Sequence, residues 1–476
     1  MTIEEIVKIL NDIAWGPWML LLLVGTGVYL SVRVGFIQFG KFGYAMRNTI
    51  GKVFSSKQQA GEGEVTPFQA VTTALAATVG TGNIAGVTGA IAVVGPGAVF
   101  WMWISALFGM VTKYAEVVLS IRYRERNAEG DWVGGPMYYI RNGLGQKWNW
   151  LACVFCVLGA LAAFGIGNMT QVNTIASSIN TAIDSFGGTT GAYTIQFFGQ
   201  TVPISSLITG AVIAMIVGMV LFGGIKRIGK VAELLVPVMA AIYIAGSLCV
   251  VFSNIGVVGK VFGMIFQGAF SAEAALGGAF GITIMTTIQK GIGRGVFSNE
   301  AGLGSAPMAH AASSESDPVK QGLYGIFEVF MDTIVICTLT ALTLLCGVES
   351  GGVEIVWGQS AGAELISASF STIFGAQIGS CVVAIGITLF ALSTILSWSL
   401  YGTRCCEFLF GGKVARVYQV LFVAVVIVGA TLKLDLVWNI ADTLNGFMAL
   451  PNLVALLGLA PVVVKLTREH FAAIRR

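Results

Sequence analysis

Long apolar runs follow one another along almost the entire chain, separated by short polar segments. The hydrocarbon core of a bilayer requires about 20 apolar residues of helix, so the pattern predicts eleven transmembrane helices and an all-α polytopic membrane protein. A leading span covers residues 14–33, and two groups of five follow, at 67–93, 97–120, 150–180, 203–224 and 231–253 and then at 262–288, 321–347, 377–403, 415–432 and 437–464. Ahead of them, Ile3, Ile6, Leu10 and Ile13 recur at helical spacing, which predicts a short amphipathic helix in the membrane interface.

The basic residues indicate how these spans are oriented. With the N-terminus outside, 24 of the 27 Lys and Arg residues lie in the inner segments, and Lys8, Lys260 and Lys433 lie outside. Because Lys and Arg gather in cytoplasmic loops, the sequence predicts an outside N-terminus and a cytoplasmic C-terminus. The composition fits a membrane protein, since 11% of the residues are charged against about 25% in soluble proteins. A net charge of +3 gives no indication of nucleic-acid binding.

Ten spans remain when the leading span is set aside, and they divide into two blocks of five. An odd number of spans per block forces the two blocks to insert in opposite orientations, and such inverted repeats are typical of secondary transporters. We therefore expect four segments along the chain. They are the interfacial helix, peripheral span and cytoplasmic segment (1–66), the first repeat (67–253), the second, inverted repeat (254–464) and a cytoplasmic tail (465–476).

The first helix of each block contains a glycine-rich stretch that predicts an interruption at membrane depth. The stretches are Gly80-Thr81-Gly82-Asn83 in the first block and the residues 277–281 in the second. Glycine tolerates unusual backbone dihedrals, and backbone groups freed inside a membrane persist only where they line a cavity. An interrupted helix offers amides to an anion and carbonyls to a cation. Close packing of helices through small residues is the alternative explanation.

The third helix of each block carries polar side chains at membrane depth. Asn168 and Gln171 are three residues apart and share a helix face, where they bind either solute or a neighbouring helix. In the second block, Thr394 and Trp398 share a face and Ser393 lies beside them. Hydroxyl groups are suitable ligands for a hard cation such as Na⁺, and an indole can form the wall of a pocket. Hydrogen bonds from the hydroxyls to the preceding helical turn are the alternative.

Charged residues inside the spans are expected to be functional or paired. Glu328 and Asp332 are one helical turn apart, and Lys113 and Glu116 are three residues apart. We interpret these residues as structural ion pairs. The alternative is that Asp332 or Glu273 carries a proton and couples transport to a proton gradient.

Other functional classes have little support in the sequence. The eight cysteines lie mostly in apolar runs, and one CxxC with two histidines in the whole chain argues against zinc, so the cysteines are interpreted as structural. Neither a nucleophile–base pair nor a metal-ligand cluster is visible within the spans, so an enzyme is not expected. A channel is a further alternative, but the sequence carries no signature of a pore built from rings of carbonyls or charges.

Three longer motifs resemble those of a known family. Gly97-Ala-Val-Phe-Trp-Met-Trp103, Gly134-Gly-Pro-Met-Tyr-Tyr139 and Arg294-Gly-Val-Phe-Ser-Asn-Glu-Ala-Gly-Leu-Gly304 resemble the alanine/glycine:cation symporter family, and the resemblance covers essentially the whole chain. It implies import of alanine or glycine coupled to Na⁺, in the plasma membrane of a prokaryote. It also implies a leucine-transporter-type fold with an additional peripheral first helix. The segment from Arg294 to Gly304 is expected in an inner loop, where it caps helices or acts in gating.

The same resemblance implies roles for individual residues. The unwound Gly80–Asn83 segment would receive the substrate carboxylate. The substrate pocket would be lined by Thr81, Gly82, Asn83, Asn168, Gln171, Phe280, Gly281, Thr283 and Trp398. A sodium site would use the carbonyls of Ala76 and Val79 and the hydroxyls of Ser393 and Thr394. Asn83 and Thr78 match a second sodium site of that fold, which we expect to be incomplete in this chain. The oligomeric state is not predicted.

Overall fold

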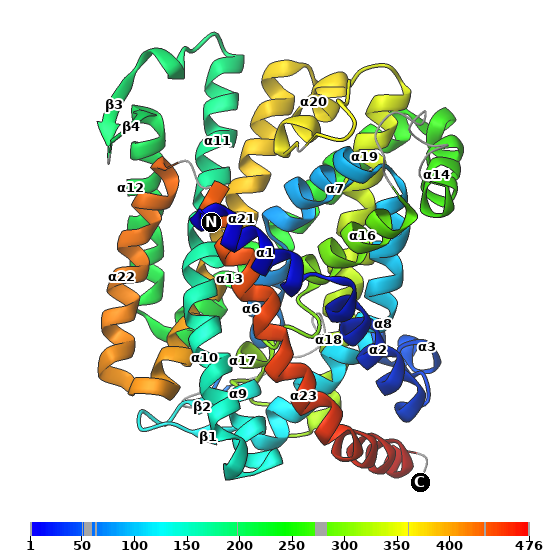
Figure 1. Cartoon of the computed structure of the whole chain (residues 1–476), viewed down its shortest axis with the longest axis vertical. Helices are drawn as coiled ribbons and strands as arrows, with labels where there is room; N and C mark the ends of the chain where they lie inside the picture. Colours follow the sequence, from blue (N-terminus) through cyan, green and yellow to red (C-terminus); the bar gives the residue numbers. More distant parts are fainter. Residues whose placement is uncertain are drawn as a thin grey trace.

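The computed structural model describes residues 2–49, 51, 60–61, 64–197, 199–271, 283–359, 361–432 and 435–474. Within these ranges the molecule is a bundle of helices, with two small antiparallel hairpins. One hairpin joins β1 (Glu125–Arg126) to β2 (Trp132–Val133), and the other joins β3 (Thr194–Phe197) to β4 (Gln200–Pro203), with Ile195 opposite Val202. In Figure 1, the helix α20 (Ala363–Phe374) lies at the top and α9 (Pro136–Tyr139) lies near the bottom, and we use these helices to name the two ends of the bundle.

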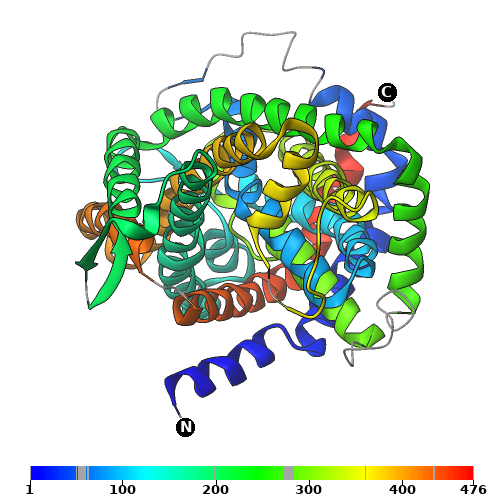
Figure 2. The same cartoon turned by 90° about the horizontal axis from the view of Figure 1, so that it is seen from above.

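The N-terminal helices lie outside the two blocks. They are α1 (Ile3–Ala14), α2 (Pro17–Val34), α3 (Ile37–Gly40) and α4 (Phe42–Asn48). Thr2 and Glu5 form a capping box that begins α1, and Ile3, Ile6, Leu10 and Ile13 are exposed, as expected for an interfacial helix. Figure 2 shows α1 at the rim of the bundle, where it packs against the last helix of the chain.

The first block follows the predicted order. Its helices are α6 (Pro67–Thr78), η1 (Gly82–Gly86), α7 (Val87–Val94), α8 (Gly97–Tyr123), α9, η2 (Ile140–Leu144), η3 (Gln146–Trp148), α10 (Asn149–Phe164), η4 (Gly165–Met169), α11 (Thr170–Ser185), η5 (Thr190–Ala192), α12 (Ile204–Leu221) and α13 (Gly224–Ser253). Pro67 at the first position of α6 and a capping box between Thr66 and Gln69 explain why that helix begins where it does.

The second block contains α14 (Ile255–Phe270), α16 (Ile284–Asn299), α17 (Pro307–His310), α18 (Pro318–Val329), η6 (Phe330–Cys337), α19 (Thr338–Glu349), α20, α21 (Ala376–Phe410), α22 (Gly412–Thr431) and α23 (Asp435–Ile474). The last helix continues beyond the predicted span and takes in the described part of the tail. Among the described residues, nine helices are long and apolar enough to cross a membrane, and the bent pair of α6 with η1 and α7 would be the tenth.

The span predicted at 262–288 differs from the structure. Helix α14 ends at Phe270 and α16 begins at Ile284, while residues 272–282 lie outside the described part of the chain. Helix α16 contains several glycines and two charged residues, so its sequence does not resemble that of a lipid-facing span. It packs against α8, which shields part of its surface from lipid. At Gly291 a Cβ would lie 2.6 Å from the Ala98 carbonyl oxygen, so the two helices approach this closely only with glycine there.

Three membrane-spanning helices contain a π-helical segment: η1 after α6, η4 between α10 and α11, and η6 between α18 and α19. Such segments are uncommon and often occur at functional sites. Here η1 contacts η6, and η4 contacts α21. Two of these segments, η1 and η6, therefore meet where the first helix of block one is interrupted.

Candidate functional site

The first interruption lies where the glycine-rich stretch predicted it. Helix α6 ends at Thr78, the backbone of Val79 leaves the helical region (φ −81°, ψ 85°), and the chain re-enters a helix at Gly82 after a bend of 47°. The Gly80 amide donates to the side-chain oxygen of Asn83 at 2.8 Å, which holds the turn. A Cβ on Gly80 would lie 2.5 Å from Thr394 Oγ1, so the close approach of α21 requires glycine at this position.

The described part of the second block also contains an interruption, which follows α16. The stretch 277–281 lies outside the described residues. Helix α16 ends at Asn299, Glu300 adopts a left-handed conformation (φ 55°), and a buried non-helical segment runs to α17 at Pro307. The expectation that Arg294–Gly304 forms an inner loop is therefore wrong. Arg294 is part of α16, and Glu300 to Gly304 lie inside the bundle.

Buried side chains bind the freed backbone of this second interruption. Oε1 of Glu116 accepts hydrogen bonds from the amides of Gly302 (3.0 Å) and Gly304 (3.1 Å) and from the side chain of Asn452 (2.5 Å). The indole of Trp398 donates to Oε1 of Glu300 at 2.9 Å. Because buried amides need partners, these contacts explain how an irregular segment is tolerated in the interior.

The intramembrane charges pair differently from the prediction. Lys113 Nζ lies 3.3 Å from Glu328 Oε1, and the other oxygen of Glu328 lies 3.2 Å from His310 Nε2. Glu116 binds backbone amides, as described above. Asp332 is also fully buried, but among the described residues no Lys, Arg or His forms an ion pair with it. The predicted ion pairing therefore holds for Glu328 and not for Asp332.

The two predicted hydroxyls of α21 point at the end of α6. Ser393 Oγ and Thr394 Oγ1 lie 3.2 Å and 3.0 Å from the Ala76 carbonyl oxygen, and both also donate to Phe390 of their own helix, at 2.7 Å and 3.0 Å. The two hydroxyls therefore bond to the preceding turn of their own helix and also contact α6. The last carbonyls of a helix carry partial negative charge, so three oxygen atoms converge where a small hard cation is favoured. Val79 is buried immediately after α6.

The polar residues of the third helix separate into two groups. Gln171 Oε1 accepts from the Thr81 hydroxyl at 3.0 Å and lies 3.4 Å from the Thr81 amide, so Gln171 belongs to the interrupted segment. Asn168 donates to the Phe422 carbonyl at 2.7 Å and connects η4 to α22. The structure therefore places Asn168 in a helix–helix contact, which was the alternative explanation, and not beside the interruption.

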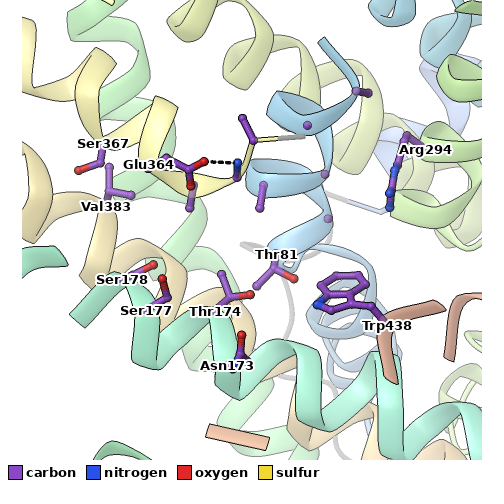
Figure 3. A pocket seen from close by; sticks show the side chains of 18 of the residues that line it. Thr81, Asn173, Thr174, Ser177, Ser178, Arg294, Glu364, Ser367, Val383 and Trp438 are labelled. Carbon is purple, nitrogen blue, oxygen red and sulfur yellow. Dashed lines mark hydrogen bonds between the residues drawn. The ribbon is translucent and has the colours of Figure 1, made fainter. Parts of the chain in front are cut away.

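A cavity of about 600 Å³ leads from the α20 end of the bundle to the interruption. Thr81 and Gly82 lie in its wall together with Phe297 of α16 and Trp438 of α23. Figure 3 shows Thr81 between Thr174 and Trp438 in this view. Its other lining residues are Ala85, Gly86, Gly89, Ala90, Val93, Asn173, Ser177, Ser178, Thr181, Lys290, Arg294, Ala361, Gly362, Ala363, Glu364, Ser367, Ser380, Val383, Ala384, Asn439 and Asp442.

Among the predicted substrate residues that the structure describes, five do not line this cavity: Asn83, Asn168, Gln171, Thr283 and Trp398. Thr283 is exposed at the N-terminus of α16, where its hydroxyl accepts from the Thr286 amide at 3.2 Å. Phe280 and Gly281 lie outside the described residues. Trp398 is buried, and its indole donates to Glu300.

Sequence reasoning missed the aromatic residues that do line the cavity. Phe297 lay within a quoted motif but was assigned to a loop, and Trp438 was treated as part of an ordinary span. The only available signal for Trp438 was its position near the start of the last helix, at the same end of the bundle as the cavity.

Comparisons with known proteins agree with this architecture. A family model described as the sodium:alanine symporter family matches residues 1–476. The sodium/alanine symporter AgcS of Methanococcus maripaludis is 45% identical over 480 residues, covering 100% of this chain and 99% of AgcS. An uncharacterized transporter of Haemophilus influenzae is 42% identical and covers 100% of this chain and 98% of its own length. The crystal structure of MhsT in complex with L-phenylalanine aligns with a TM-score of 0.59 at 15% identity, over 86% of this chain and 99% of MhsT, and shows a shared fold.

Proposed function

Since the chain belongs to the sodium:alanine symporter family, we propose that it imports a small neutral amino acid, alanine or glycine, together with Na⁺ by alternating access. The observation that carries the proposal is the cavity that ends at the interrupted helix, where Thr81 and Gly82 form part of its wall. Interrupted helices of inverted-repeat transporters expose both amides and carbonyls at mid-membrane. A zwitterionic amino acid and a cation can use both at once.

We assign the first sodium ion to the oxygen atoms between α6 and α21. Ser393 and Thr394 supply hydroxyl oxygens, and Ala76 supplies a carbonyl oxygen that both hydroxyls already approach. The carbonyl of Val79, the first residue beyond α6, would complete this side of the site. Oxygen ligands without sulfur or nitrogen suit a hard monovalent cation.

The substrate is proposed to bind on the other side of the interruption, within the cavity. Amides at the start of η1, near Thr81 and Gly82, would receive the carboxylate because the N-terminal end of a helix favours negative charge. Gln171 orients Thr81 through its hydrogen bond to the hydroxyl. Phe297 and Trp438 stack with ring centroids 6.5 Å apart and supply an apolar wall for the substrate side chain.

The orientation of the protein is proposed from charge. Most Lys and Arg residues flank the α9 end, so this end faces the cytoplasm of a prokaryotic cell and the N-terminus lies outside. Lys290 and Arg294 are exceptions to the predicted distribution, because they line the cavity at the α20 end. With this orientation the cavity opens to the exterior. The buried Lys113–Glu328 pair and the Glu116 contacts lie below it, toward the cytoplasmic side of the second interruption.

The chain's own residues define what alternating access must change. Opening toward the cytoplasm requires the segment 300–306 to move relative to α8. The hydrogen bonds from the Gly302 and Gly304 amides to Glu116 must then either break or move together with the Glu116 side chain. Closing toward the exterior brings the α16 and α23 walls, which carry Phe297 and Trp438, over the bound solute. A bound ion links α6 to α21 and would therefore favour one arrangement of these helices over the other.

Uptake of radiolabelled alanine into proteoliposomes tests this function. An inward Na⁺ gradient should drive accumulation, and replacement of Na⁺ by choline on both sides should remove it. Accumulation that survives the replacement and collapses with a protonophore would contradict sodium coupling and support the proton-coupled alternative. Unitary currents in planar bilayers under the same conditions would contradict a carrier mechanism.

A further inference from the structure

A second cavity lies between the N-terminal helix α1 and helix α16, and we call it the α1 cavity. Its volume is about 310 Å³. Trp15 at the end of α1 and Pro17 at the start of α2 line one side, and Gln289 and Gly293 of α16 line the other. None of these four residues lines the larger cavity that leads to the interrupted helix. The α1 cavity is therefore a separate space at the rim of the bundle, where Figure 2 shows α1.

Two basic side chains form a wall that is shared by the two cavities. Lys290 and Arg294 are one turn apart on α16 and line both spaces. Within the part of the chain that the structure describes, neither side chain takes part in a hydrogen bond or a salt bridge, and the Arg294 guanidinium lies 5.4 Å from the centroid of the Phe297 ring. Figure 3 shows Arg294 at the edge of the larger cavity, away from Glu364. A guanidinium has five N–H donors in a planar fork that suits a phosphate or a carboxylate, so this pair of side chains is available to bind an anion.

Two carboxylates line the same cavity. Asp12 belongs to α1 and Asp442 belongs to α23. Both attract Lys290 electrostatically, but within the described ranges neither forms a salt bridge with it. One oxygen of Asp442 already accepts a hydrogen bond from Asn11. The α1 cavity therefore presents two positive and two negative charges, and it suits a ligand that carries both an anionic group and an ammonium group.

The surroundings of the α1 cavity place it at the level of lipid headgroups. Helix α1 is amphipathic, and the exposed Leu10 and Ile13 of its apolar stripe suit the boundary between headgroups and acyl chains. Trp15 in the cavity wall and the exposed Trp18 are of the residue type that gathers at this depth. On the other side, α16 begins with the exposed Ile284. A ligand whose polar end fills the cavity can therefore lay apolar chains against both helices, which favours a phospholipid over a free amino acid.

We propose that the α1 cavity binds the headgroup of a phospholipid that carries a primary amine, as phosphatidylethanolamine does. Its phosphate contacts Lys290 and Arg294, and its ammonium group donates to Asp12 and Asp442. A choline headgroup has no N–H to donate, and a glycerol headgroup has no positive charge for the carboxylates, so the cavity disfavours both. The inference goes beyond the proposed function, because its ligand is not transported.

The same arrangement explains two basic residues on the side of the protein where few are expected. Lys and Arg are scarce outside the cytoplasmic loops, and Lys290 and Arg294 are exceptions. A lipid phosphate between them neutralises charge that no carboxylate of the described residues pairs with. Because both side chains and Asp442 also line the larger cavity, the bound headgroup would fix their positions at its entrance.

Equilibrium binding of radiolabelled dioctanoyl-phosphatidylethanolamine to the purified, delipidated full-length protein in detergent tests the proposal. The wild type should bind this lipid saturably, and the matching choline and glycerol lipids should bind about tenfold more weakly. Lys290→Gln/Arg294→Gln, which removes both positive charges, should weaken binding by about 10- to 100-fold, and Asp12→Asn should reduce the preference for the amine. Lys8→Gln/Lys260→Gln is the matched control, because it removes two exposed positive charges outside the cavity, and it should leave binding unchanged.

The outcomes also separate the lipid from other ligands. Wild-type affinity in Lys290→Gln/Arg294→Gln, or equal affinities for the three headgroups, would overturn the proposal. Displacement of the lipid by alanine or inorganic phosphate as effectively as by unlabelled phosphatidylethanolamine would also overturn it, and would assign the two cations to a soluble anion. If the double variant fails to fold, Lys290→Gln alone changes an exposed side chain and should weaken binding by about tenfold, and unchanged binding there would overturn the proposal as well. The measurement involves no transport, so its outcome is independent of the proposed function.

Discussion

Replacing Thr394 by valine removes one oxygen of the first sodium site and keeps the shape of the side chain. Thr394 is 2% exposed, and its hydroxyl lies 3.0 Å from the Ala76 carbonyl oxygen. A polar contact with a charged group contributes about 1.5–3 kcal/mol, and 1.4 kcal/mol corresponds to a tenfold change in an equilibrium constant. We therefore expect the Na⁺ concentration for half-maximal alanine uptake to rise by about 10- to 100-fold in Thr394→Val.

The assay is the initial rate of radiolabelled alanine uptake into proteoliposomes as a function of external Na⁺. Thr394→Ser keeps the hydroxyl and should stay within a few-fold of the wild type, whereas Thr343→Val controls for the loss of a buried hydroxyl elsewhere. Thermal unfolding of each variant shows whether the fold survives the change. A Thr394→Val protein that is folded and has an unchanged half-saturating Na⁺ concentration would refute the assignment of this hydroxyl to the ion.

Two further substitutions test the packing that supports the site. Gly80→Ala should abolish uptake and destabilise the fold by about 1–3 kcal/mol, because the added Cβ would lie 2.5 Å from Thr394 Oγ1; retention of uptake at the wild-type rate would show that the turn is not tightly packed. Lys113→Met should destabilise the protein by about 3–5 kcal/mol, because it removes the ammonium partner of the buried Glu328 carboxylate and leaves only His310 beside it, and the double change with Glu328→Gln should recover much of the loss in thermal unfolding. Equal stability of the single and double variants would contradict that explanation.

Much of the architecture could be predicted because a membrane imposes simple length and charge rules. Apolar runs long enough for a bilayer located most of the spans, and the glycines at 80 and 82 located the first interruption, since freed backbone at that depth has to line a cavity. The prediction for 277–281 lies outside the described residues, and the interruption after α16 was not predicted, because Arg294 to Gly304 were expected in an inner loop. Glu300, Gly302 and Gly304 form it, and their role depends on Glu116 from a helix nearly two hundred residues away.

The residues of the candidate site could be predicted only where the sequence of their own helix, or the resemblance to the family, indicates their position. Ser393 and Thr394 were expected near Ala76, and the structure brings the three together. Asn168 and Gln171 share a face by spacing, yet one contacts α22 and the other contacts Thr81. Helical periodicity gives the face of a side chain but not the neighbour that the face meets.

The N-terminal helix α1 packs against α23 at the mouth of the cavity. Asn11 donates to Asp442 Oδ2 at 3.0 Å, and the Trp15 indole donates to the Asp442 carbonyl at 3.0 Å, while Asp442 also lines the cavity. The exposed isoleucines of α1 suit the headgroup region of a bilayer. Changes in acyl-chain length or lateral pressure of the surrounding lipid would then move α1 and, through its contacts with Asp442, the entrance of the cavity. The rate of transport is therefore expected to depend on bilayer thickness.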